Sequence, residues 1–81
     1  MSEKLMRDIL NILVRKKCYT NNEIVDAVDI AKEINLSLGY IHEELGKMEY
    51  LDLVKLYKFL DSTSAQVTPA GLLTYDEAGK D

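Results

Sequence analysis

The sequence of 81 residues predicts a mainly α-helical fold with one small β-hairpin, which places it in the α+β class. Three observations support this prediction. Apolar residues recur at spacings of three and four in three successive segments, which is the period of an α-helix. A segment rich in leucine, β-branched and aromatic residues follows, and a polar turn cluster interrupts it as in a hairpin. A threonine–proline pair then begins a last, short helix. Because 81 residues leave no room for two cores, we expect a single domain over residues 1–81.

The first helix is predicted over residues 1–18. On a helical wheel its apolar side chains cover an arc of roughly 200°, whereas a helix on one core needs a stripe little wider than about 100°. The surplus edge consists of Met6, Leu10 and Val14. Either the hairpin or the C-terminus of the same chain covers this edge, or a second copy of the chain covers it in a homodimer. The sequence supports the two explanations about equally.

The second helix is predicted over residues 20–35. Thr20 and Glu23 have the spacing of a capping box, in which the threonine caps the helix and the glutamate bonds back to it. A one-sided apolar stripe follows. The helix is expected to end near Asn35, because asparagine tolerates the left-handed conformation that often closes a helix.

The third helix is predicted over residues 37–50, with Ser37 as its cap. Ile41, Leu45 and Met48 form its buried stripe, and the adjacent pair Glu43-Glu44 is expected on a solvated face. Two glycines, Gly39 and Gly46, also lie on the side of the helix opposite the buried stripe. Because only a short turn separates the second and third helices, the two form a helix-turn-helix.

The hairpin is predicted over residues 53–68. Val54, Leu56 and Leu60 are expected to share one face of its first strand, and the polar segment 61–64 provides the turn. Thr68 is then expected to cap a short C-terminal helix over residues 69–77, since a proline follows it in the first turn.

Several stretches of the chain resemble the winged helix-turn-helix domain of bacterial and archaeal transcription regulators. Asp29–Ser37 and Gly39–His42 are similar to the second helix, the turn and the start of the recognition helix in that family. Leu45–Val54 is similar to the exit from the recognition helix into the wing, and Val67–Gly71 to the threonine–proline segment after the wing. The resemblance covers roughly residues 20–75 and concerns mainly the fold.

The resemblance implies a DNA-binding regulator whose third helix enters the major groove while the hairpin flanks it along the backbone. The residues expected to face the DNA from these two elements are Ser37, Gly39, Tyr40, Glu43, Lys47, Lys55 and Lys58. A symmetric dimer is the usual requirement for such an operator. The chain departs from the family where it leaves the recognition helix, because residues 50–53 contain no glycine. Asp52 or a neighbour must therefore make that turn at some conformational cost.

The charge distribution argues against DNA binding. The chain has 14 acidic and 10 basic residues, a net charge of −4. Between residues 21 and 52, eight acidic residues and two basic residues give −6 in the unit that should approach phosphates. Arg15-Lys16-Lys17, which ends the first helix, could join Lys55 and Lys58 in one basic patch after folding. The alternative is a protein-interaction or adaptor module with an acidic helix-turn-helix face that does not bind DNA.

The inventory of reactive residues argues against an enzyme or a cofactor-dependent protein. Cys18 is the only cysteine and His42 the only histidine, too few for a zinc site. The sequence has no glycine-rich loop that could hold a phosphate. No apolar run is long enough to cross a membrane, and a lone cysteine favours a reducing compartment. We therefore expect a cytoplasmic protein with no metal, no cofactor and no membrane partner.

Overall fold

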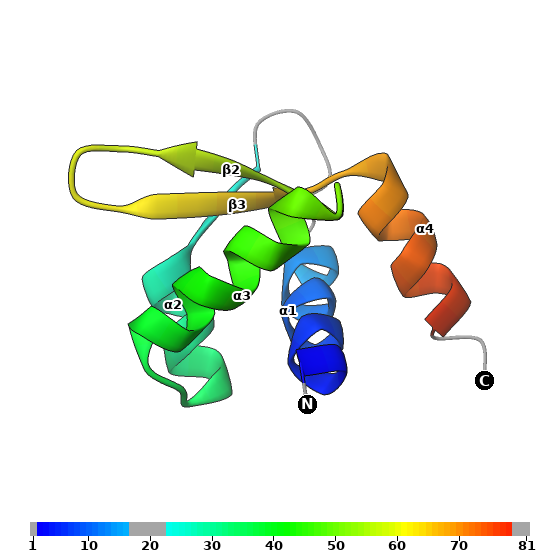
Figure 1. Ribbon diagram of the computed structural model, residues 1–81, viewed down its shortest axis with the longest axis horizontal. Coiled ribbons are helices and arrows are strands. Elements are labelled where there is room, and N and C mark those ends of the chain that lie inside the picture. The colour runs from blue at the N-terminus through cyan, green and yellow to red at the C-terminus, as the bar shows by residue number, and fades with distance from the viewer. Residues whose placement is uncertain (1, 17–22, 79–81) are drawn as a thin grey trace.

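Four helices and one three-stranded antiparallel sheet form the part of the chain that the computed structural model describes, residues 2–16 and 23–78 (Figure 1). The elements follow one another as α1 (Ser2–Arg15), β1 (Val25–Asp26), α2 (Ala27–Ile34), α3 (Leu38–Tyr50), β2 (Val54–Lys58), β3 (Thr63–Val67) and α4 (Pro69–Ala78). The predicted α+β class is confirmed, with a hairpin between the third and the last helix. Residues 1, 17 and 18 of the predicted first helix lie outside the described residues, and Lys16 forms a turn after α1.

Strand β3 is the centre of the sheet, whose order is β1-β3-β2. The hairpin pairs β2 with β3 from Val54 opposite Val67 to Lys58 opposite Thr63. Strand β1 adds only two residues on the other side of β3. The largest fully buried side chains come from three helices and β2, and they are Ile9, Leu13, Ile30, Ile41, Leu45, Met48 and Val54. The core therefore lies between α1, α2, α3 and the inner face of the sheet.

The predicted start of the second helix is wrong. Residues 20–22, with Thr20 of the expected capping box, lie outside the described residues, and Glu23 is not helical. Val25 pairs with Ala65 in the sheet and is buried, so the chain is extended where a helix was expected. Asp26, in an extended conformation, caps α2 instead, and its carboxylate accepts a hydrogen bond from the Val28 N–H at 2.8 Å. Pairing with a distant strand decides where this helix begins.

The turn between α2 and α3 forms as predicted. Asn35 ends α2 in the left-handed conformation, with φ at 66°, and its N–H donates to the Ala31 carbonyl at 2.8 Å. Ser37 then caps α3, and its hydroxyl oxygen accepts from the Tyr40 N–H at 3.3 Å. These two residues define the turn, because one ends the first helix and the other begins the second.

Asp52 makes the turn from α3 into the hairpin. Its φ is 63°, the left-handed region that glycine adopts most easily, which confirms that this residue replaces the missing glycine. The Leu53 N–H donates back to the Met48 carbonyl at 2.9 Å. The chain thus leaves α3 within a few residues and enters β2 at Val54.

The C-terminal helix begins where the sequence predicts. The Thr68 hydroxyl oxygen accepts a hydrogen bond from the Gly71 N–H at 3.0 Å and so caps α4. Gly71 is required at its position, because a Cβ there would lie 2.0 Å from the Leu53 carbonyl oxygen. Close contact between this turn of α4 and the start of the hairpin holds the helix beside the sheet.

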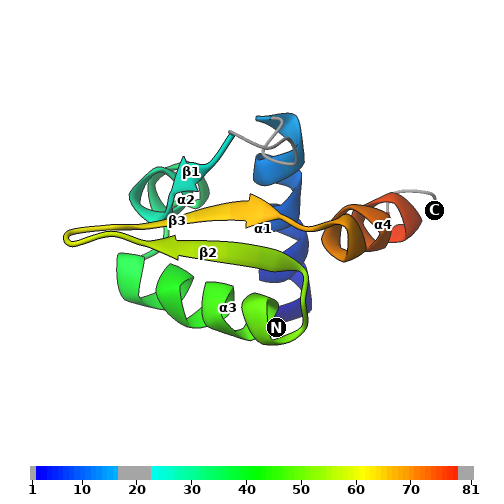
Figure 2. The same ribbon diagram turned by 90° about the horizontal axis from the view of Figure 1, so that it is seen from above.

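Helix α4 packs on α1 and covers part of its surplus apolar edge (Figures 1 and 2). The Tyr75 hydroxyl donates to the Asn11 side-chain oxygen at 3.1 Å. Leu10 is 3% exposed, whereas Met6 and Val14 are half-buried. Burial within the chain therefore accounts for Leu10, whereas part of the surface of Met6 and Val14 stays exposed.

Glu44 contradicts the expectation of a solvated Glu43-Glu44 pair. Glu43 is exposed, but Glu44 is only 5% exposed. It lies three residues after Ile41 and four before Met48, so the helical period places it on the buried stripe of α3. Position in the helix outweighs the preference of a carboxylate for water at this site.

Candidate nucleic-acid interface

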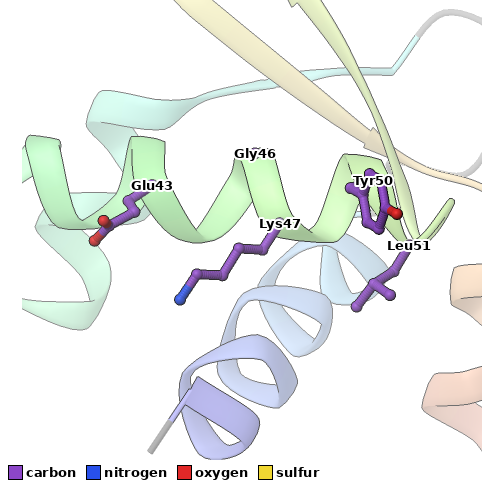
Figure 3. Close-up of a pocket in the computed structure, with 5 residues that line it drawn as sticks. All are labelled: Glu43, Gly46, Lys47, Tyr50 and Leu51. Carbon is purple, nitrogen blue, oxygen red and sulfur yellow. The ribbon is translucent and has the colours of Figure 1, made fainter.

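The face of α3 opposite the core is open to solvent. Figure 3 shows a shallow hollow on this face that Glu43, Gly46, Lys47, Tyr50 and Leu51 line. The side chains of Glu43 and Lys47 project to the same side of the helix, one turn apart (Figure 3). Two of the predicted DNA-facing residues thus meet on one surface, with opposite charges.

The two glycines of α3 stand in open space. A Cβ on Gly39 or on Gly46 would meet no atom within 4 Å. A glycine inside a helix costs about 1 kcal/mol relative to alanine. Packing within the described chain does not account for that cost, and at both positions the exposed side of α3 carries no side chain.

Ser37 and Tyr40 lie at the N-terminal end of the same helix. Ser37 is exposed, although its hydroxyl caps α3. Tyr40 is 52% exposed. The structure therefore places Tyr40, Glu43 and Lys47 on the accessible side of α3, with Ser37 exposed at its N-terminal cap.

The hairpin separates the two predicted wing lysines. Successive residues of a strand point to opposite faces, so Lys55 and Lys58 lie on different faces of β2. Lys55 shares the outer face with Tyr57, and its Nζ lies 5.3 Å from the centre of the tyrosine ring. The Tyr57 hydroxyl in turn donates to the Gln66 side-chain oxygen at 3.0 Å.

Lys58 faces α3. It lines a cleft between α3 and the hairpin together with His42, Leu45, Gly46, Glu49, Leu56 and Thr63. A phosphate group that entered this cleft would meet the ammonium group of Lys58. Of the two wing lysines, only Lys58 shares a surface with the exposed part of α3.

The basic residues at the C-terminal end of α1 form ion pairs with α2. Arg15 and Lys16 both form ion pairs with Glu33, and the Lys16 Nζ lies 3.6 Å from the Glu33 carboxylate. Lys17 lies outside the described residues. The structure therefore directs Arg15 and Lys16 toward an acidic residue of α2 and does not show them joining Lys55 and Lys58 in one patch.

Four large side chains near this interface are exposed. Tyr50 and Leu51, at the end of α3, are 89% and 55% exposed. Tyr50 lies seven residues after Glu43, so the helical period could have placed it on the same face. Phe59 and Leu60 are 55% and 99% exposed at the end of the hairpin, and the expectation that Leu60 shares a face of the first strand with Val54 and Leu56 is wrong. Leu60 lies in the loop after β2, where strand alternation no longer applies.

Neither a membrane helix nor a metal site is found in residues 2–16 and 23–78. No helix among them is long and apolar enough to cross a bilayer. No three histidine, cysteine, aspartate or glutamate side chains within this part of the chain gather closely enough to hold a metal ion.

The arrangement of α2, the tight turn, α3 and a flanking hairpin is the winged helix-turn-helix fold. Solved structures share it over nearly the whole chain. BldR of Sulfolobus solfataricus, a transcriptional regulator, superposes with a TM-score of 0.78 at 20% identity, over 95% of this chain and 52% of BldR. TubR from Bacillus megaterium pBM400 superposes with a TM-score of 0.80 at 18% identity, over 99% of this chain and 97% of TubR. A protein from Ralstonia eutropha JMP134 has a TM-score of 0.81 at 16% identity, over 94% and 95% of the two chains.

The similarity lies in the fold. No protein-family model matches the sequence, and no curated protein matches it either. The chain spans about half the length of BldR and almost all of TubR. What BldR does as a whole therefore bears on this chain only through the shared winged helix.

Proposed function

We propose that the chain is a winged-helix DNA-binding protein that regulates transcription, with α3 in the major groove and the β2–β3 hairpin along the backbone. The observation that carries this proposal is the free face of α3. It is smooth at Gly39 and Gly46, accessible at Tyr40, Glu43 and Lys47, and flanked by Lys58 across the cleft. The shared fold with BldR, a transcriptional regulator, supports it.

The chemistry of α3 favours particular base edges. Lys47 can donate to guanine O6 and N7 in the major groove, and Glu43 can accept from the amino group of cytosine. The two side chains lie one helical turn apart on the same face. We therefore expect the preferred site to contain G·C pairs at the bases that α3 contacts.

The phosphate contacts must be few. With Lys47 on a base, Lys58 is the lysine beside α3 that is left for phosphate, whereas Arg15 and Lys16 pair with Glu33. Because each neutralised phosphate adds to both the affinity and its salt dependence, one copy of the chain is expected to bind weakly. A symmetric dimer would double this footprint and match two half-sites.

The surface between α1 and α4 is the proposed dimer contact. Met6 and Leu10 line a small groove there with Glu3, Arg7, Thr74 and Tyr75. Leu73 on α4 is 63% exposed beside it. In a two-fold contact the same patch meets itself, so Glu3 of one copy can face Arg7 of the other. Met6 and Val14 keep enough exposed surface to contribute.

Fluorescence anisotropy with a labelled random duplex, repeated as the salt concentration rises, tests the proposal. We expect binding at low salt that weakens steeply with added salt. Lys47→Ala should weaken it, and Lys32→Ala, an exposed lysine of α2 away from the hollow, serves as the control. Absence of binding at micromolar protein in low salt would refute DNA binding by this chain.

The adaptor function is the second candidate, and the apolar surface around the helix-turn-helix favours it. Leu36 and Leu38 are each 39% exposed beside the acidic helices, and Tyr40 is 52% exposed. Protein interfaces commonly combine such aromatic and aliphatic side chains with a charged rim. Glu43→Lys distinguishes the two functions. The variant should weaken the binding of a basic protein partner, yet strengthen non-specific binding to DNA.

A further inference from the structure

The end of the β2–β3 hairpin carries two large apolar side chains in water. Phe59 is 55% exposed and Leu60 is 99% exposed. Figures 1 and 2 both show this end of the hairpin projecting beyond α2 and α3, away from the body of the molecule. Neither side chain therefore serves the core.

The geometry of the turn does not require leucine. The Phe59 N–H donates to the Ser62 carbonyl at 2.8 Å, which leaves Leu60 and Asp61 as the two central loop residues. Among the described residues only Asn35 and Asp52 combine a positive φ with a side chain, so this loop is not one of the primed turns that select asparagine, aspartate or glycine. Leucine fits such a loop, but the backbone conformation does not select it. Neither folding nor turn formation explains an exposed leucine here.

The surroundings of the tip suit duplex DNA. Lys58, two residues before Leu60, faces the cleft beside α3, and its charge balances that of Asp61, so residues 58–62 carry no net negative charge. Proteins that reach into the minor groove, which is about 6 Å wide, often insert leucine or phenylalanine between base pairs and bend the helix. A two-residue loop with one fully exposed leucine has the shape for this insertion.

We propose that Leu60, supported by Phe59, enters the minor groove next to the α3 site and bends the DNA by partly unstacking one base step. This inference depends on the DNA binding proposed above, and it adds that the protein shapes the duplex. The partner is thus double-stranded DNA with a flexible pyrimidine–purine step at the position of the wing, because such steps unstack most easily.

The test measures bending and affinity separately. A duplex of about 30 base pairs, labelled at both ends, reports the bend by energy transfer, and anisotropy reports the affinity. We expect the wild-type chain to bend the duplex by at least about 20°. Leu60→Asn should abolish most of the bend and weaken binding about three- to tenfold, whereas Leu60→Met should retain the bend. Leu60→Asn should fold normally, because the side chain has almost no contacts and asparagine favours turns.

Ile24→Asn is the matched control. Ile24 is 40% exposed and precedes β1, at the opposite edge of the sheet from β2, so this variant should bend the duplex as the wild type does. If the wild type binds DNA without bending it, or Leu60→Asn bends it equally, the inference is wrong while DNA binding stands. If no variant binds DNA, both proposals fail, and the exposed hairpin tip becomes a candidate protein contact.

Discussion

Thr68 joins the end of α3 to the start of α4. Its hydroxyl donates to the Asp52 carbonyl at 2.5 Å and accepts from the Gly71 N–H at 3.0 Å. One side chain thus holds the left-handed turn of Asp52 against the first turn of the last helix. The position of the hairpin relative to α3 depends on this connection, and so does the geometry of the proposed DNA interface.

Thr68→Val should destabilise the protein by about 1–2 kcal/mol, because the variant keeps the shape of the side chain but loses the helix cap and the bond to Asp52. Urea denaturation measures the change. Thr74→Val is the control: its hydroxyl donates only to the Ala70 carbonyl of the preceding turn, so a loss under about 0.5 kcal/mol is expected. Equal losses in the two variants would contradict the role of Thr68.

Alanine should have opposite effects at two glycines. At Gly71 a Cβ would meet the Leu53 carbonyl oxygen at 2.0 Å, so Gly71→Ala should cost about 1–3 kcal/mol or more through forced displacement of α4. At Gly46 a Cβ meets nothing, so Gly46→Ala should stabilise the fold by up to about 1 kcal/mol. Thermal melting of both variants checks the signs. A stabilising Gly71→Ala would show that the contact between α4 and the hairpin is looser than described.

The left-handed conformation of Asp52 predicts opposite effects on stability for two substitutions at this position. Asp52→Gly removes the Cβ that disfavours a φ of 63° and leaves the carbonyl that Thr68 uses, so its stability should equal or exceed that of the wild type. Asp52→Val should lose about 1–2 kcal/mol, because a β-branched residue resists the left-handed region. If valine were tolerated as well as glycine, this turn would not have the strained conformation described.

The two wing lysines should differ in DNA binding. Lys58→Gln removes the ammonium group that faces α3, so the slope of log affinity against log salt should fall by about 0.9. Lys55→Gln, on the outer face of β2 beside Tyr57, should leave the slope nearly unchanged. Anisotropy titrations at several salt concentrations compare them. Equal changes in slope would mean that the DNA contacts both faces of the hairpin.

Local signals made much of the fold predictable. Asn35, Ser37 and Thr68 each act as the cap that its residue type indicates, and Asp52 makes the turn for which the sequence offers no glycine. Strand β1 was not predictable, because its two residues are extended only through pairing with β3, about 40 positions later in the chain. Local propensity contains no information about such a partner.

The candidate site was predictable in part. The helical period alone predicts that Tyr40, Glu43 and Lys47 share one face of the third helix. The period of two along a strand could also have separated Lys55 from Lys58. The burial of Glu44 could not be inferred with the same rule, because the pattern and the charge of that residue point in opposite directions. Only the packing of α3 against its neighbours decides between them.

Strand β2 is an outer strand of the sheet, and its free backbone groups could pair with the same strand of another molecule. Lys55 and Lys58 are the exposed residues of this strand, and lysines on an edge strand discourage such association through repulsion and hydration. Lys58, the proposed phosphate contact, and Lys55 therefore also disfavour edge-to-edge pairing between two copies of the sheet. A chain that lost both lysines would be prone to aggregate through its sheet, whatever became of its DNA binding.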